Sequence, residues 1–421
     1  MRAALRYGEV VYFKFGPRRG YLITNPADIR HVLQDNARNY HKSPLYQKLR
    51  MYLGNGLLTS EDALWLRQRR IAQPAFHRQR VASLAQVMTA AVGEAAAHWQ
   101  TVADRGDAVD VDEEMMRLTR TVVVRALLGS DLGPYTERID DAWSTINEFI
   151  GEDFWSLGLT SWVPTPRRRR FEAARRLLRQ AVDHVISERR RHPSDRPDLL
   201  AMLLAARDDD TGEGMTDEQL RVEVTTFLLA GQETTSLALT WIWYLLSQHP
   251  QAQRRLEEEV DSVLEGRPPE FSDLASLPYT RMVIDEALRL YPPAWGFSRQ
   301  AVGDDELGGY PLPSGWMAFV VPFVLHRLPS MWDEPDAFDP DRFSPERSAD
   351  RPKFAYVPFG AGPRQCIGNQ FALMEAHLTV AALAQRYRLR LAPGHAVDPW
   401  PLITLRPRHG MPMFIERRAR R

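Results

Sequence analysis

The segment from Thr216 to Pro250 constrains the fold of this chain most strongly, because it predicts one unusually long helix. It contains no proline before its end, and Gly231 is its only glycine. Thr216 and Gln219 have the spacing of a capping box, in which two side chains satisfy free backbone N–H groups of the first turn. A helix of ~30 residues is about 45 Å long. Such a helix crosses an entire domain, so we expect the rest of the chain to pack around it.

The other periodicities predict a mainly α protein with a minor β part. Apolar residues recur at helical spacing in 81–99, 115–128 and 171–186, and further helices are expected at 279–291 and 369–386. Alternation predicts a hairpin of 11–15 and 21–24, and short strands at 319–321, 388–391, 402–405 and 413–416. We expect a single domain over residues 1–421, with its β-rich part mainly at 8–25, 297–322 and 388–417.

Charge and hydropathy exclude several classes of function. Lys and Arg total 54, as do Asp and Glu, so bulk charge does not favour a nucleic-acid partner. The most apolar window, 222–246, includes Glu223, Glu233 and several threonines, which argues against a membrane span. The first residues lack the apolar core of a signal peptide, so we expect a cytoplasmic protein. The arginine runs at 164–170 and 189–196 are interpreted as solvated helix faces or turns.

The chain has one cysteine, Cys366, which excludes an intramolecular disulfide and any multi-thiolate metal cluster. It follows a glycine-rich turn, residues 359–365, and precedes the helix expected from Asn369. Free N–H groups at a helix N-terminus favour a thiolate, which can act as a metal ligand or a nucleophile. A nucleophile needs a nearby base. His377 is eleven residues along the same helix, about 16 Å away, so it is a poor candidate for that base.

Residues 359–368 fill every fixed position of the pattern F-G-x-G-x-R-x-C-x-G and resemble the haem-binding loop of the cytochrome P-450 family, the haem-thiolate monooxygenases. Soluble bacterial members are the most similar type. The resemblance implies the P-450 fold, a helix-rich domain with a small β-rich region and haem between two long helices. It makes Cys366 the axial ligand of the iron of haem b. Phe359 would pack near the sulfur, Gly368 would let the haem approach closely, and Arg364 would bind one of the propionates.

The centre of the long helix, Ala230-Gly231-Gln232-Glu233-Thr234-Thr235, resembles the family's A-G-x-[DE]-T-[TS] motif. A glycine followed by hydroxyl and carboxylate residues is expected to open the helix backbone locally and leave room for dioxygen. The resemblance implies that Thr234 donates a hydrogen bond at the oxygen-binding position. Glu233 would relay protons from solvent.

Two further motifs imply support for the haem. Glu286 and Arg289 form an E-x-x-R pair, and Arg342 follows where the family has P-E-R-F, although Asp341 replaces the usual Glu. The three are expected to form a buried structural triad.

Trp65 and Arg69 fit the family's W-x-x-x-R and would bind a propionate. Arg299, after Pro292-Pro293, stands where the family often has another propionate-binding arginine.

The resemblance also implies a substrate pocket over the haem. Its expected residues are mostly apolar: Phe227, Ala230, Ala294, Trp295, Phe297, Leu402, Ile403 and Thr404. An apolar pocket suits a lipophilic substrate such as a fatty acid, terpenoid, carotenoid or steroid-like molecule, hydroxylated or epoxidised with O2 as co-substrate.

The chain has no dinucleotide-binding fingerprint, so we expect electrons from NAD(P)H to arrive through a ferredoxin or flavodoxin with its reductase. This partner would dock on a basic face around Arg67, Arg70 and Arg78 of a monomer. Two alternatives remain: a haem-thiolate enzyme that uses peroxide or isomerises its substrate, and a non-haem lipid-binding protein. The first strand is expected almost directly after Met1, where the family usually has an earlier helix.

Overall fold

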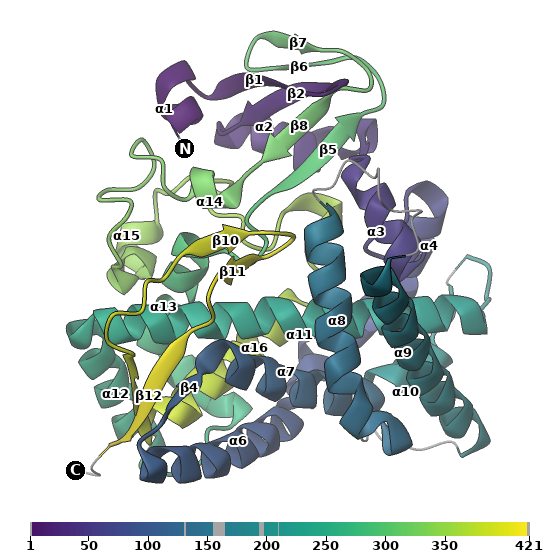
Figure 1. Ribbon diagram of the computed structural model, residues 1–421. Coiled ribbons are helices and arrows are strands. Elements are labelled where there is room, and N and C mark those ends of the chain that lie inside the picture. Colours follow the sequence, from purple (N-terminus) through teal and green to yellow (C-terminus); the bar gives the residue numbers. More distant parts are fainter. Residues whose placement is uncertain (1, 130–131, 155–164, 193–197, 209, 419–421) are drawn as a thin grey trace.

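The computed structural model describes residues 2–129, 132–154, 165–192, 198–208 and 210–418. The predicted long helix is confirmed as α11, Asp217–Gln248, and it runs across the whole width of the molecule (Figure 1). Its first turn carries the predicted capping box: the Thr216 side chain accepts from the Gln219 N–H, and the Gln219 side chain accepts from the Thr216 N–H. Nineteen of its residues are buried, so packing on all sides stabilises a helix that local propensity alone would not hold.

Several of the other α-helices pack against α11. They are α1 Arg2–Tyr7, α2 Pro26–Arg30, α3 Leu45–Leu53, α4 Asp62–Ala72, α5 Arg78–Ala82, α6 Ala85–Arg105, α7 Val111–Leu128, α8 Thr136–Phe154, α9 Pro166–Arg191, α10 Leu199–Ala205, α12 Pro250–Leu264, α13 Pro278–Leu290, α14 Pro322–Leu325, α15 Pro345–Ser348 and α16 Asn369–Ala384. In Figure 1, α8, α9 and α10 lie at one end of α11, and α12 and α13 lie toward the other end. The helices predicted at 279–291 and 369–386 are confirmed as α13 and α16.

The strands form four small sheets. They are β1 Val10–Phe15, β2 Arg18–Ile23, β3 Tyr40–Lys42, β4 Ala108–Asp110, β5 Phe297–Ala301, β6 Asp305–Leu307, β7 Tyr310–Leu312, β8 Met317–Val320, β9 Tyr387–Leu391, β10 Pro399–Pro401, β11 Leu405–Pro407 and β12 Pro412–Arg417. The largest sheet has the order β1-β2-β8-β5-β3, and the predicted hairpin pairs Val10 with Ile23 at its open end. The parallel pair β2–β8 brings the N-terminal hairpin beside a strand almost 300 residues later.

Two hydrophobic cores lie on the two halves of α11. One packs the C-terminal half against α6, α13 and α16, and Trp241 stacks on Tyr291 there with ring centres 4.2 Å apart. The other packs the N-terminal half against α7, α8, α9 and α10, with Trp143 and Phe171 fully enclosed. Because both cores share one rigid helix, the middle of α11 is held in a fixed position between them.

The structure corrects three local predictions. Residues 402–405 were expected to form a strand, but Leu402, Ile403 and Thr404 form the bend between β10 and β11. The short helix α1 precedes β1, whereas the first strand was expected almost directly after Met1. The helix backbone is continuous through Gly231, where local opening was expected; a Cβ at Gly231 would lie 3.0 Å from Val123 Cγ2, so this glycine lets α7 approach closely.

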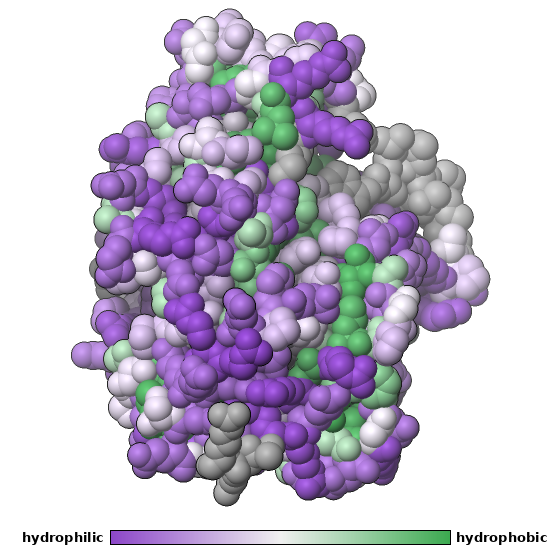
Figure 2. All heavy atoms as spheres, turned by 90° about the vertical axis from the view of Figure 1, so that its left-hand side faces the viewer, coloured by the Kyte–Doolittle hydropathy of each residue, from purple (hydrophilic) through white to green (hydrophobic). Residues whose placement is uncertain are grey.

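On the face shown in Figure 2, hydrophilic residues cover most of the surface and hydrophobic residues form narrow strips between them. Among the described residues, no helix has both the length and the apolar composition that a membrane span requires. The arginine run at 189–196 begins at the exposed end of α9, and the run at 164–170 opens the same helix; their remaining residues, 164 and 193–196, lie outside the described part.

Candidate active site

A largely apolar cavity of about 490 Å³ lies between the middle of α11 and the start of α16. All the residues predicted to bind a cofactor or substrate or to handle protons line it: Trp65, Arg69, Phe227, Ala230, Glu233, Thr234, Ala294, Trp295, Phe297, Arg299, Phe359, Arg364, Cys366, Gly368, Leu402, Ile403 and Thr404. These residues come from five separate parts of the sequence. The fold therefore brings together one chamber with a thiol, a charged end and apolar walls.

The turn before α16 delivers Cys366 to the cavity. Gly362 has φ +70°, and a Cβ there would lie 1.8 Å from the Leu33 carbonyl oxygen, so only glycine fits. Gly360 also has a positive φ, +66°, but faces open space. The Cys366 N–H donates to the Phe359 carbonyl at 2.9 Å, which closes the turn.

The Cys366 side chain is accessible, and it lines the cavity, which the surrounding segments of the chain enclose in part. Burial therefore raises the pKa of its thiol, while a hydrogen bond from the Gly368 backbone and the charge of Arg69 oppose that rise. The sequence predicts a thiolate stabilised by the N-terminus of the following helix. In the protein alone, desolvation favours the neutral thiol more strongly than the helix N-terminus favours the thiolate. A bound metal cation would reverse the balance, because coordination deprotonates a thiol.

One end of the cavity is lined by four cationic side chains: Lys42, Arg69, Arg299 and Arg364. Arg364 pairs with Glu61, donates to the Ser60 carbonyl at 3.0 Å and lies 4.1 Å from the centre of the Trp65 ring. The other three bond to neutral groups, since Arg69 donates to the Gln365 carbonyl at 2.9 Å and Lys42 to those of Leu57 and Leu58. Burial lowers the pKa values of Lys42 and Arg69, and that of Arg364 to about 10.

These features fit a haem. Among the described residues no three His, Cys, Asp or Glu side chains could hold a bare metal ion, so a metal bound by Cys366 must bring its other ligands with it. The partly buried cations at the charged end outnumber their one carboxylate partner, Glu61, and the two propionates of a haem would supply the missing negative charge. Apolar walls suit a planar macrocycle.

Across the cavity, Glu233 and Thr234 project from the middle of α11. Glu233 Oε1 accepts from Thr404 Oγ1 at 2.6 Å and from Arg406 Nη2 and Nε at 2.7 and 2.9 Å. Thr234 Oγ1 donates to the Ala230 carbonyl at 2.8 Å. Thr404 in the bend that was expected to be a strand, and Arg406 in β11 beside it, thus orient the Glu233 carboxylate.

A second carboxyl, that of Asp112 at the start of α7, lies behind this group. Burial raises its pKa to about 7, and the charge of Arg406 opposes the rise. Thr240 Oγ1 donates to Asp112 Oδ1 at 3.3 Å. Arg406 therefore sits between two carboxyls. No sequence signal identified Arg406 or Asp112, because neither belongs to a motif and they are almost 300 residues apart.

The expected triad also meets in space. Arg289 donates to both oxygens of Glu286 at 2.6 and 2.8 Å, and Arg342 Nε lies 3.3 Å from Glu286 Oε1. All three side chains are at least 96% buried, since the most exposed, Arg342, has 4% accessibility. Asp341, the departure from the family pattern, points elsewhere and forms two bonds with Arg255 at 2.6 and 2.9 Å.

The basic face expected around Arg67, Arg70 and Arg78 is partly neutralised. Arg70 pairs with Asp208 and Asp210, and Arg67 lies 3.5 Å from Glu213, all in the acidic turn before α11. Arg78 is exposed, and no carboxylate partner is found for it in the described part of the chain. The fold brings the acidic turn onto α4, a contact that local charge patterns do not reveal.

Comparison with known proteins gives a consistent result. The sequence model described as "Cytochrome P450" matches residues 1–411. Cyclooctatin synthase of Streptomyces melanosporofaciens is 42% identical over 95% of this chain and 87% of its own length. Cyclooctat-9-en-7-ol 5-monooxygenase of the same organism is 38% identical over 92% and 84%. The crystal structure of a cytochrome P450DA heme domain superimposes with a TM-score of 0.89 at 28% identity, covering 98% and 90% of the two chains.

Proposed function

This chain belongs to the cytochrome P450 family of monooxygenases, and on that premise we propose that it inserts one oxygen atom of O2 into a terpenoid, by hydroxylation or epoxidation. The observation that carries the proposal is the single cavity that places the Cys366 thiol at one wall and the Glu233–Thr234 pair at another. Family membership removes the alternative of a non-haem lipid-binding protein. The same pair of proton-handling residues favours use of O2 over the peroxide-using or isomerising alternative.

Cys366, Arg69, Arg299 and Arg364 are the residues we assign to cofactor binding, with haem b as the cofactor. Cys366 Sγ would ligate the iron, and the arginines with Trp65 and Lys42 would hold the propionates at the charged end. A haem bound through a thiolate supplies the electron-transfer and O–O bond-cleaving chemistry. The Glu286–Arg289–Arg342 triad contributes rigidity to the chain before Cys366, because Arg289 ties the segment 335–337 to α13.

The substrate proposal rests on the walls of the cavity and on the names of the relatives. Phe227, Ala294, Trp295 and Leu402 leave a mainly hydrocarbon surface, which binds a lipophilic ring system by burial of apolar area. One relative is named for the synthesis of cyclooctatin, and the other for the 5-monooxygenation of cyclooctat-9-en-7-ol. A cyclic terpenoid is therefore the class we propose.

The protons of the reaction are assigned to Glu233 and Thr234. Thr404 and Arg406 hold Glu233 Oε1, and movement of the β10–β11 bend would release this carboxylate to carry a proton from solvent into the cavity. The Thr234 hydroxyl, now bonded to Ala230 O, would rotate to donate a hydrogen bond into the cavity. Trp295 Nε1 donates to the Leu402 carbonyl at 3.0 Å, so a substrate that displaces Trp295 would also move this bend.

Electrons would come from NAD(P)H through a ferredoxin or flavodoxin with its reductase. We place the docking site near Arg78, beside α4 and the Cys366 loop, because Arg67 and Arg70 already have carboxylate partners. We further propose that residues 1–421 act as one catalytic domain, as a monomer, in the cytoplasm where reduced NAD(P)H is available.

Turnover with isotopically labelled oxygen tests the proposal. Purified holoenzyme, a ferredoxin or flavodoxin system and a panel of cyclic terpene alcohols would be incubated under 18O2 and the products analysed by mass spectrometry. We expect a product with one 18O atom, which Cys366→Ala abolishes and Arg78→Gln reduces through slower electron delivery. Isomerised product without 18O, or product formed only from added peroxide, would favour the alternative reactions.

A further inference from the structure

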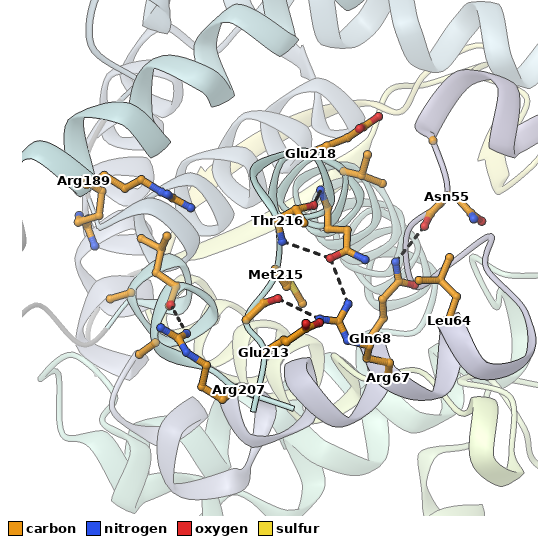
Figure 3. Close-up of a pocket in the computed structure, with 18 residues that line it drawn as sticks. Asn55, Leu64, Arg67, Gln68, Arg189, Arg207, Glu213, Met215, Thr216 and Glu218 are labelled. Carbon is orange, nitrogen blue, oxygen red and sulfur yellow. Dashed lines mark hydrogen bonds and ion pairs between the residues drawn. The ribbon is translucent and has the colours of Figure 1, made fainter. Parts of the chain in front are cut away.

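A thin partition separates the cavity from a second, more open pocket of about 1030 Å³. Figure 3 looks nearly along α11, with Arg67 and Gln68 of α4 on one side of this outer pocket and Arg189 and Arg207 on the other. Gly54, Asn55, Gln219 and Val222 line the outer pocket, whereas Leu57, Leu58, Thr226 and Phe227 line the cavity. The partition therefore consists of residues 54–58 packed against one turn of α11.

Glu223 lies inside this partition. Its position on α11 falls between Val222, which faces the outer pocket, and Thr226, which faces the cavity. The residue has 0% accessibility. Its Oε2 accepts from the Leu57 N–H at 3.0 Å, and its Oε1 has no hydrogen-bond partner in the described structure. A buried carboxylate oxygen without a donor is costly, and protonation of that oxygen removes most of the cost.

The packing around Glu223 is too close for another side chain to shield it. A Cβ at Gly56 would lie 2.8 Å from Thr226 Oγ1, 3.0 Å from Val222 Cγ1 and 3.3 Å from Glu223 Oε2. The backbone of residue 56 therefore packs directly against the side chains of Val222, Glu223 and Thr226. Because Val222, which precedes Glu223 in the sequence, lines the outer pocket, we expect protons to reach the carboxyl from this side.

Lys42, on β3, connects Glu223 electrostatically to the charged end of the cavity. Its Nζ donates to the carbonyls of Leu57 and Leu58, the segment whose N–H binds Glu223. The other charged groups on the surrounding elements are engaged elsewhere: Arg50 of α3 donates to the Thr59 carbonyl, Arg67 of α4 to Gln219 and Gly214, and Glu61 pairs with Arg364.

Burial raises the pKa of Glu223 to about 7, and the Leu57 N–H and the Lys42 charge oppose that rise.

We propose that Glu223 is a redox-linked proton-binding site: when one electron from the redox partner enters a haem bound at the charged end, the Glu223 carboxylate takes up one proton from water. This inference rests on the proposed function. The step is balanced, because the electron adds one negative charge to the buried site and the proton neutralises the negative charge of the Glu223 carboxylate. The physical cause is the low dielectric of the interior, in which an added negative charge disfavours a nearby carboxylate and raises its proton affinity.

The test is the reduction potential of the holoenzyme, followed by spectroelectrochemistry from pH 6 to pH 9. Coupled uptake of one proton per electron makes the reduction potential fall as the pH rises. The slope approaches 59 mV per pH unit, because one pH unit is a tenfold change in proton concentration and 59 mV is a tenfold change for a one-electron couple. We expect this slope in the wild type and a flat profile in Glu223→Gln, which preserves the acceptor for the Leu57 N–H. Glu218→Gln, a change at the rim of the outer pocket, is the matched control and should keep the wild-type slope.

Each outcome decides the inference. A wild-type potential independent of pH would overturn it without the need for any variant, as would a slope that survives in Glu223→Gln. A slope lost in Glu61→Gln but retained in Glu223→Gln would assign the proton to the carboxyl beside Arg364 and also overturn it. Failure of the proposed function is distinguishable, because the purified protein would then lack a thiolate-ligated haem spectrum at every pH.

Discussion

Replacement of Arg289 by methionine tests the buried triad in depth, because the structure accounts for every donor of this guanidinium. Nε and one Nη2 proton bind Glu286, the other Nη2 proton binds the Ala337 carbonyl at 2.9 Å, and Nη1 binds the carbonyls of His326 and Pro335 at 2.7 and 2.6 Å. All five N–H groups are thus used, at a side chain with 0% accessibility.

Arg289→Met would leave the Glu286 carboxylate buried with only the Asp339 N–H and a 3.3 Å contact to Arg342, and would leave three carbonyls without their donor. Loss of one partner of a buried ion pair costs about 3–5 kcal/mol, which is a large part of the roughly 5–15 kcal/mol of a typical native state. Arg281→Met is the matched control on the same helix, since Arg281 forms an exposed pair with Asp285 worth about 0.5 kcal/mol or less.

Urea unfolding, followed by fluorescence, measures both variants. With a slope of about 3 kcal/mol per molar urea, Arg289→Met should lower the midpoint by roughly 1 M or more, and Arg281→Met by about a tenth of that. If the two variants shift the midpoint equally, the triad is not the stabilising element that its geometry indicates.

Three further predictions concern the cavity. Gly360→Ala should lower the free energy of unfolding by about 1–2 kcal/mol because residue 360 has a positive φ. Gly362→Ala should lower it more and also reduce the haem-to-protein ratio, because its Cβ would collide with the Leu33 carbonyl. Equal effects of the two variants on unfolding and on haem content would contradict this. Arg406→Met removes two of the three hydrogen bonds on Glu233 Oε1, so product formed per electron should fall by about tenfold or more, while Arg408→Met, whose partner is the exposed Asp398, should change it little. Burial raises the pKa of Asp112 to about 7, so the wild type loses stability as the pH rises from about 4 to 7, where the unfolded chain releases a proton that the folded chain retains. Asp112→Asn should therefore have a higher melting temperature than the wild type at pH 8 and nearly the same melting temperature at pH 4. A gain of the same size at both pH values would exclude this cause.

Local sequence signals were sufficient where the determining contacts are local. The capping box of Thr216 and Gln219, the prolines after Leu290 and the glycines of the Cys366 turn each act within a few residues, and the corresponding elements appear as predicted. The motif residues around the cavity also converge as expected, because the family resemblance supplies the long-range arrangement that periodicity cannot give.

The predictions that failed involve contacts between distant segments. Pairing of β10 with β11 displaces the strand expected at 402–405 by a few residues and turns Thr404 and Arg406 toward Glu233. Lys42, Asp112 and Glu223 resemble ordinary polar residues in the sequence, and only the fold reveals their burial. The pKa of Cys366 was also misjudged, because the degree of desolvation at a helix N-terminus depends on which segments enclose it.

The central claim is that Cys366 ligates a haem through its thiolate, and the optical spectrum of the purified protein, reduced with dithionite and then exposed to carbon monoxide, tests it most directly. The account predicts a Soret band shifted far to the red in the wild-type protein, and loss of that shift in Cys366→Ala. An ordinary haem-carbonyl spectrum in the wild type, or a shift that persists in the variant, would contradict it.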